Sequence, residues 1–159
     1  MSKTATLALL LAGCAADFGT VVNVGPSAER HIEKIAEAVD EMNGLLGHEV
    51  FSVRMVDSDE MIDGQTIVRH RDAPFRRESA AAFTRLTSFG LVISMRDTCN
   101  ARCFLHELGH AGGLMHSSDP NNTMFHEVGA AYLTERQINR VLLLDQYKSE
   151  RIIGGRLRK

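Results

Sequence analysis

The segment from His106 to His116 constrains this chain more than any other part of its 159 residues. It contains three histidines and a glutamate in the order His-Glu-Leu-Gly-His-Ala-Gly-Gly-Leu-Met-His. On a helix, His106 and His110 are four residues apart and lie on one face. Both imidazoles can therefore reach one metal ion. Gly113 allows a left-handed turn, which would bring His116 back as a third ligand.

Three protein ligands indicate a catalytic zinc rather than a structural one. They leave the fourth position of a tetrahedral zinc free for water, whereas structural sites use four protein ligands. Glu107 stands beside the first ligand, where its carboxylate can take a proton from that water. The spacing therefore predicts hydrolysis assisted by one zinc ion, with Glu107 as the general base.

The stretch H-E-L-G-H-A-G-G-L-M-H-S-S-D-P-N-N-T-M-F (residues 106–125) resembles the metzincin metalloproteases, in particular their matrixin-like branch. The resemblance implies zinc ligands at His106, His110 and His116. It also implies a general base at Glu107 and a Met-turn methionine at Met124, which forms an apolar floor beneath the imidazoles. It extends more weakly into residues 133–139 and covers residues 91–147 with any specificity.

What the resemblance implies for the fold is an α+β, metzincin-like zincin. Such a fold has a twisted, mostly parallel sheet with an edge strand, two long helices, and a short C-terminal subdomain after the histidine-bearing helix. The implied activity is that of a zinc-dependent endopeptidase. In the family the edge strand binds the substrate backbone as an added strand, and here it would be Leu91 to Met95 or a neighbour.

His126 follows Met124 by two residues. In the astacin and serralysin branches a tyrosine stands at this distance and assists at the metal. His126 is therefore a candidate to donate a hydrogen bond to the oxyanion. The alternatives are that it lines the specificity pocket or faces solvent. His31, His48 and His70 have no partner pattern and are predicted to lie at the surface.

The N-terminus resembles a bacterial lipoprotein signal. Lys3 precedes an apolar stretch from Ala5 to Ala12, and Leu11-Ala12-Gly13-Cys14 follows the pattern of a lipobox. This predicts a signal peptide over residues 1–13, lipidation of Cys14, and one catalytic domain over residues 14–159, anchored outside the cytoplasm. The alternative is a buried first strand or helix with an incidental cysteine. A protein with an unprocessed signal would be secreted or cytoplasmic.

Cys99 and Cys103 remain as an even pair, and at a helix start their Cα atoms would lie near 6 Å, a distance that a disulfide tolerates. A structural zinc site built from these cysteines with His106 and His110 is rejected. Those four residues share one stripe of a helix about 16 Å long, at about 1.5 Å per residue, and cannot wrap one ion.

Composition predicts one domain and excludes a polyanionic partner. At 159 residues and 44% hydrophobic content, one core is expected, and a net charge of −2 gives no basic field for nucleic acid. No apolar run reaches the ~20 residues of a membrane-spanning helix, so a lipid anchor would be the membrane contact. We expect a monomer that acts on a peptide or protein. The acidic turn from Asp57 to Gly64 does not match a calcium loop, so calcium is unsupported.

Hydrophobic periodicity predicts the remaining elements. Strands are expected at Thr20–Val24, Glu49–Val56, Thr66–His70 and Gly90–Met95. Helices are expected from Ser27, as N-cap, to about Leu46, and from Thr134 to about Tyr147. Residues 72–88 are expected to be irregular or partly helical.

Two other functions fit the same residues. One is a surface lipoprotein that binds zinc without catalysis and serves adhesion or assembly. The intact Glu107 argues against it, because such a protein could lose the base at no cost. The other is a specialised maturation protease that cuts one partner.

Overall fold

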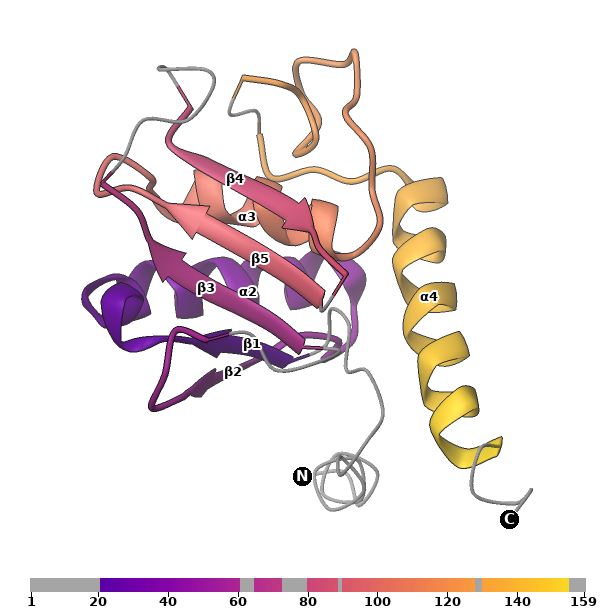
Figure 1. Ribbon diagram of the computed structural model, residues 1–159. Helices are drawn as coiled ribbons and strands as arrows, with labels where there is room; N and C mark the ends of the chain where they lie inside the picture. Colours follow the sequence, from indigo (N-terminus) through magenta and orange to yellow (C-terminus); the bar gives the residue numbers. More distant parts are fainter. Residues whose placement is uncertain (1–20, 61–64, 73–79, 89, 128–129, 155–159) are drawn as a thin grey trace.

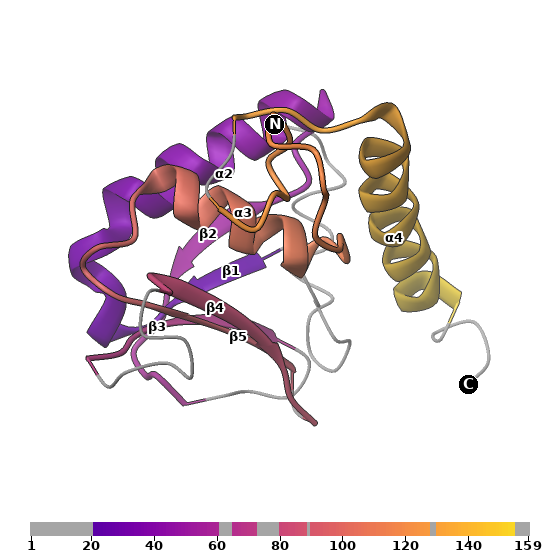
Figure 2. The ribbon, with the colours of Figure 1, turned by 90° about the horizontal axis from the view of Figure 1, so that it is seen from above.

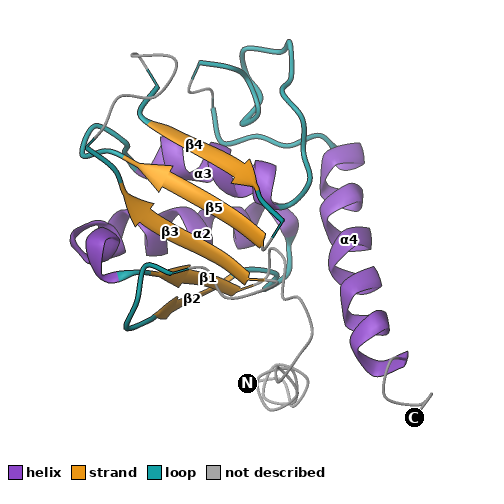
Figure 3. Cartoon of the chain, in the orientation of Figure 1, coloured by secondary structure: helices purple, strands orange, loops and turns teal. Residues whose placement is uncertain are grey.

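Five strands form one sheet in the order β2-β1-β3-β5-β4, shown in Figures 1 and 3. The strands are β1 (Val21–Val24), β2 (Ser52–Met55), β3 (Gln65–His70), β4 (Ala82–Leu86) and β5 (Gly90–Met95). All pair in parallel except β4, which runs antiparallel to β5. The central strands carry fully buried β-branched side chains, as expected of parallel strands covered by helices. These are Val22, Val24, Val68 and Ile93.

The computed structural model describes residues 21–60, 65–72, 80–88, 90–127 and 130–154. The predicted signal peptide and Cys14 lie outside these residues, as does part of the acidic turn. Within the described ranges, no helix has the length and apolar character needed to cross a membrane.

Helices α2 (Ile32–Leu46) and α3 (Ala101–Ala111) cover the same face of the sheet, as Figure 2 shows from above. Helix α4 (Glu135–Gly154) stands beside the end of α3. Gly47 ends α2 in the left-handed conformation, with φ 68°. The mixed fold with a mostly parallel sheet agrees with the fold class predicted from the sequence.

The prediction for residues 72–88 was wrong at β4, which is a strand from Ala82 to Leu86. Phe83 and Leu86 are 53% and 71% exposed, so no buried apolar face marks this strand in the sequence. Its pairing with β5 places β4, rather than β5, at the edge of the sheet. The edge strand was predicted to be Leu91 to Met95 or a neighbouring strand. In the structure it is the neighbouring strand, β4.

The prediction for the start of the first helix also needs correction. A 3-10 helix, η1 (Pro26–His31), precedes α2, and Ser27 does not cap it. The Ser27 hydroxyl oxygen instead accepts a hydrogen bond from the backbone N–H of His70, 3.0 Å away. This contact ties η1 to the end of β3.

His31 is buried and the side chain of His70 is mostly covered, so neither lies at the surface as predicted, while His48 is exposed as predicted. His31 is 3% exposed, and the His70 side chain is 6% exposed. A 3-10 helix has three residues per turn, so its buried and exposed faces fall at different residues than they would in an α-helix. His31 consequently faces His70, with His31 Nε2 3.0 Å from His70 Nδ1.

Candidate metal centre

The start of α3 is fixed by a cap and a covalent bond. Asn100 caps the helix, and its side-chain oxygen accepts a hydrogen bond of 2.9 Å from the Cys103 N–H. Cys99 and Cys103 form a disulfide, with their Cα atoms 5.4 Å apart. The segment entering α3 is therefore held in place ahead of the first histidine.

The end of α3 returns the chain toward its own histidines. Gly113 adopts a left-handed conformation with φ 79°, as predicted. The Gly112 N–H donates to the Leu108 carbonyl at 2.8 Å, and the Leu114 N–H donates to the Gly109 carbonyl at 2.9 Å. This reversal places His116 opposite the helix that carries His106 and His110.

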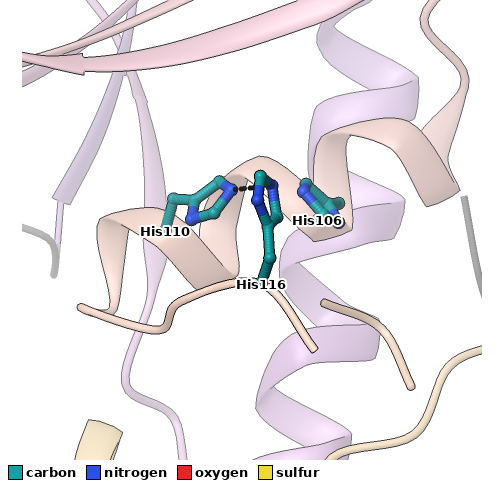
Figure 4. Close-up of side chains that lie close together, drawn as sticks. All are labelled: His106, His110 and His116. Atoms are coloured by element: carbon teal, nitrogen blue, oxygen red, sulfur yellow. Dashed lines mark hydrogen bonds between the residues drawn. The ribbon is translucent and has the colours of Figure 1, made fainter. Parts of the chain in front are cut away.

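Three imidazole rings converge at this point, as Figure 4 shows. One ring nitrogen from each of His106, His110 and His116 lies within 4.8 Å of the others. His110 Nε2 and His116 Nε2 are 3.1 Å apart. Nitrogens that bind one tetrahedral zinc at 2.0–2.1 Å lie about 3.3 Å apart, so the spacing suits that ion.

The backbone around the site fixes which ring nitrogens can bind a metal. His106 Nδ1 is 2.9 Å from the Thr123 carbonyl, and His110 Nδ1 is 2.9 Å from the Leu114 carbonyl. Because a carbonyl oxygen only accepts, each Nδ1 carries the hydrogen and each Nε2 keeps a free electron pair. Burial lowers the pKa of His106 to about 4, so this ring is neutral at pH 7. The donor set therefore fits zinc.

Met124 is fully buried and packs beneath α3 against Gly109. A Cβ atom at Gly109 would overlap the Met124 sulfur, so only glycine fits at this helix position without displacement. The Met124 carbonyl accepts a hydrogen bond of 2.7 Å from the Ser117 N–H, which closes the loop that follows His116. The structure thus places Met124 under the histidine-bearing helix.

Asn122 and Gln137 support this loop, and the sequence did not single them out as site residues. The fully buried Asn122 accepts from the Met124 N–H at 2.9 Å and donates to Gln137 Oε1 at 2.8 Å. Gln137 belongs to the first turns of α4. The pair joins the floor of the site to that helix, a link between distant segments that carries no local sequence signal.

Glu107 is 7% exposed and is held by a residue of the edge strand. The Thr84 hydroxyl, on β4, donates to Glu107 Oε2 at 2.5 Å. Burial raises the pKa of Glu107, because it disfavours the charged carboxylate. Thr84 was also missed from the sequence, since it lies in the segment predicted to be irregular.

His126 lies apart from the three converging histidines. Its side chain is 56% exposed, and its ring centroid is 4.3 Å from that of Phe125. Its Nε2 atom lies 3.9 Å from a carboxylate oxygen of Glu127. Among the described residues, the group at this site that could hold a metal ion consists of His106, His110 and His116.

The family model described as Matrixin matches residues 22–141. The chain belongs to the matrixin family. The match extends from β1 into α4 and so includes both the sheet and the histidine site. Family membership makes the protein a zinc metallopeptidase, as the sequence predicted. His106, His110 and His116 are a group that could bind such a metal.

Among solved structures, the fold is similar to that of a zinc-dependent peptidase from Methanocorpusculum labreanum. The two share 10% sequence identity over 76% of this chain and 99% of the other, with a TM-score of 0.50. At this identity the likeness concerns the fold alone. A search of curated proteins found no match.

Replacing Gly109 by alanine is expected to destabilise this matrixin by about 1–3 kcal/mol, because the new methyl group overpacks against Met124. Urea unfolding measures the change. Gly44→Ala is the matched control, since a Cβ there meets nothing within 4 Å, and it should stabilise α2 by up to about 1 kcal/mol. Equal effects of the two substitutions would contradict the close packing at Gly109.

Thr84→Val is expected to lower the free energy of unfolding by about 1–3 kcal/mol, because it leaves the buried Glu107 carboxylate without this donor. Thr84→Ser keeps the hydroxyl and should lie close to wild type. Thermal unfolding of both variants at pH 7 compares them. The hydrogen bond would have no role in stability if valine and serine gave the same midpoint.

Proposed function

We propose that this matrixin is a zinc-dependent endopeptidase in which Glu107 is the general base. The observation that carries the proposal is the position of the buried Glu107 carboxylate, one residue after the first of three converging histidines. His106, His110 and His116 are the proposed zinc ligands, and Met124 is the proposed Met-turn residue. The substrate would be a peptide or protein.

Zinc, when bound, supplies a Lewis acid for the peptide carbonyl and lowers the pKa of a water molecule to near 7. Glu107 accepts a proton from the attacking water as the new C–O bond forms at the peptide carbon. The C–N bond then breaks, and Glu107 delivers the proton to the departing amine.

The edge strand β4 supports cleavage within an extended chain. A substrate segment can add to a sheet edge through main-chain hydrogen bonds, with alternate side chains facing toward and away from the enzyme. Thr84, in the middle of β4, contacts Glu107, so a segment lying along β4 would pass the proposed base. An added strand can continue in both directions, which favours an endopeptidase.

The cellular location stays a prediction. Processing after residue 13, lipidation of Cys14 and anchoring outside the cytoplasm depend on residues outside the described part of the chain. Mass spectrometry of the mature N-terminus would test all three. An unmodified Met1 would contradict them.

Glu107→Gln is expected to reduce turnover by about 10²- to 10⁴-fold, because the amide cannot accept the proton. Zinc should remain bound, since the three histidines are unchanged. A quenched-peptide library, cleaved by the full-length chain, measures turnover, and elemental mass spectrometry measures zinc. Glu37→Gln, on the exposed face of α2, is the control for loss of one carboxylate.

Two results would argue against the proposed mechanism. Full turnover by Glu107→Gln would remove Glu107 from the reaction. Zinc in the wild type without cleavage of any peptide would favour a binding role in adhesion or assembly, or a protease with a single protein substrate.

Removal of zinc by a chelator is expected to abolish cleavage and to lower the midpoint of thermal unfolding. An ion that binds only the folded state stabilises it by about 4 kcal/mol at a thousand times its dissociation constant. Adding Zn²⁺ back should restore both properties, as measured by peptide cleavage and calorimetry. Cleavage that survives complete removal of the metal would rule out a metallopeptidase.

A further inference from the structure

A second cluster of metal-ligating side chains lies where β3 and β5 end. His31 is the last residue of η1, His70 is the last of β3, and Asp97 follows β5 by two residues. In Figure 1 the arrows of β3 and β5 both point to the left of the sheet, the side on which the first helical segment starts. None of these residues belongs to the three-histidine site, and the proposed reaction uses none of them.

The three possible ligand atoms are close together. His31 Nε2 lies 3.0 Å from His70 Nδ1 and 3.4 Å from Asp97 Oδ1, and His70 Nδ1 lies 3.9 Å from Asp97 Oδ1. Ligands of one tetrahedral zinc at about 2.0–2.1 Å are about 3.3 Å apart. The three separations bracket this value.

The hydrogen bonds of His70 leave Nδ1, the ring nitrogen that faces His31, able to bind an ion. His70 Nε2 donates to Asp72 Oδ1 at 2.6 Å, so in the neutral ring Nδ1 keeps its electron pair. A histidine that binds a metal usually donates its other ring N–H to a group such as a carboxylate. Asp72 therefore orients His70 toward His31 and Asp97.

His31 Nε2 and Asp97 Oδ1 face His70 Nδ1. These three atoms offer more lone pairs than hydrogens for bonding to one another. Burial, followed by the charge of Lys34, lowers the pKa of His31 and favours its neutral form. One hydrogen on His31 Nε2 cannot bond well to both His70 Nδ1 and Asp97 Oδ1. A cation between the three atoms satisfies all of them.

Nearby charges balance one another. Arg30 Nε lies 3.4 Å from Asp97 Oδ1, in a pair with both side chains more than half exposed. Such exposed pairs contribute little, so Asp97 can exchange this partner for an ion. Lys34 Nζ donates to the backbone carbonyls of Asp97 and Cys99, at 3.2 and 3.3 Å. Two carboxylates, of Asp72 and Asp97, offset the two cationic side chains.

We propose that His31, His70 and Asp97 form a second metal site, for a divalent transition ion such as Zn²⁺. Two imidazoles and one carboxylate are a donor set suited to zinc and its neighbours. The ion would join the start of α2, the end of β3 and the segment that leads from β5 to the Cys99–Cys103 disulfide. Its role would be structural, because it connects three parts of the fold.

The test is the number of zinc ions bound by the full-length chain. Metal-stripped protein is dialysed against Zn²⁺ and its zinc content is measured by elemental mass spectrometry. The wild type should bind two equivalents. Asp97→Asn should bind one, His116→Ala should bind one, and the double variant should bind none. Asp97 is 67% exposed, so Asp97→Asn should keep the fold, which circular dichroism checks.

Two further variants sharpen this test. His48→Ala removes an exposed histidine outside both clusters and should leave two equivalents. Asp72→Ala removes the carboxylate that orients His70 and should weaken the second site about 10- to 100-fold. Peptide cleavage by Asp97→Asn should equal that of wild type at saturating zinc.

Each outcome decides between the two sites. If Asp97→Asn binds as much zinc as the wild type, the second site is overturned and the cluster is a hydrogen-bond network around His70. If the wild type binds one ion that Asp97→Asn loses and His116→Ala keeps, the second site stands and zinc binding by His106, His110 and His116 fails.

Discussion

The packing of Met124 against Gly109 is the contact on which the site depends most. The helix that carries the proposed ligands must be held in place, and here a fully buried thioether lies where a Cβ at Gly109 would otherwise be. The same loop brings the Thr123 carbonyl to His106 Nδ1, which sets the tautomer of that ring. The support of the helix and the orientation of its first proposed ligand therefore come from two adjacent residues.

The local part of this arrangement could be predicted from the sequence. His106, His110, Gly113 and His116 lie within eleven residues, and helix geometry alone fixes the relation of the first two. The left-handed turn at Gly113 needs a residue without a Cβ, and the chain has one there. The central strands could be predicted because they are rich in β-branched residues, among them the buried Val22, Val68 and Ile93.

The parts that could not be predicted depend on which segments become neighbours. Thr84 reaches Glu107 only because β4 pairs antiparallel with β5, and an exposed edge strand has no buried pattern to identify it. His31 and His70 are 39 residues apart, and their contact follows from the order of the strands. Asn122 and Gln137 pair across a loop whose path no local rule determines.

Strand β4 forms an edge of the sheet and also holds Glu107 through Thr84. Its residues therefore differ in how freely they can change during evolution. Side chains alternate along a strand, so Thr84 faces Glu107 while Phe83 and Arg85 face the other way and are exposed. A short hydroxyl side chain is the group at position 84 that can both fit and donate to the carboxylate. No such requirement applies to Phe83 and Arg85. Drift at those neighbours can alter the outer surface of the edge strand while the support of Glu107 stays unchanged.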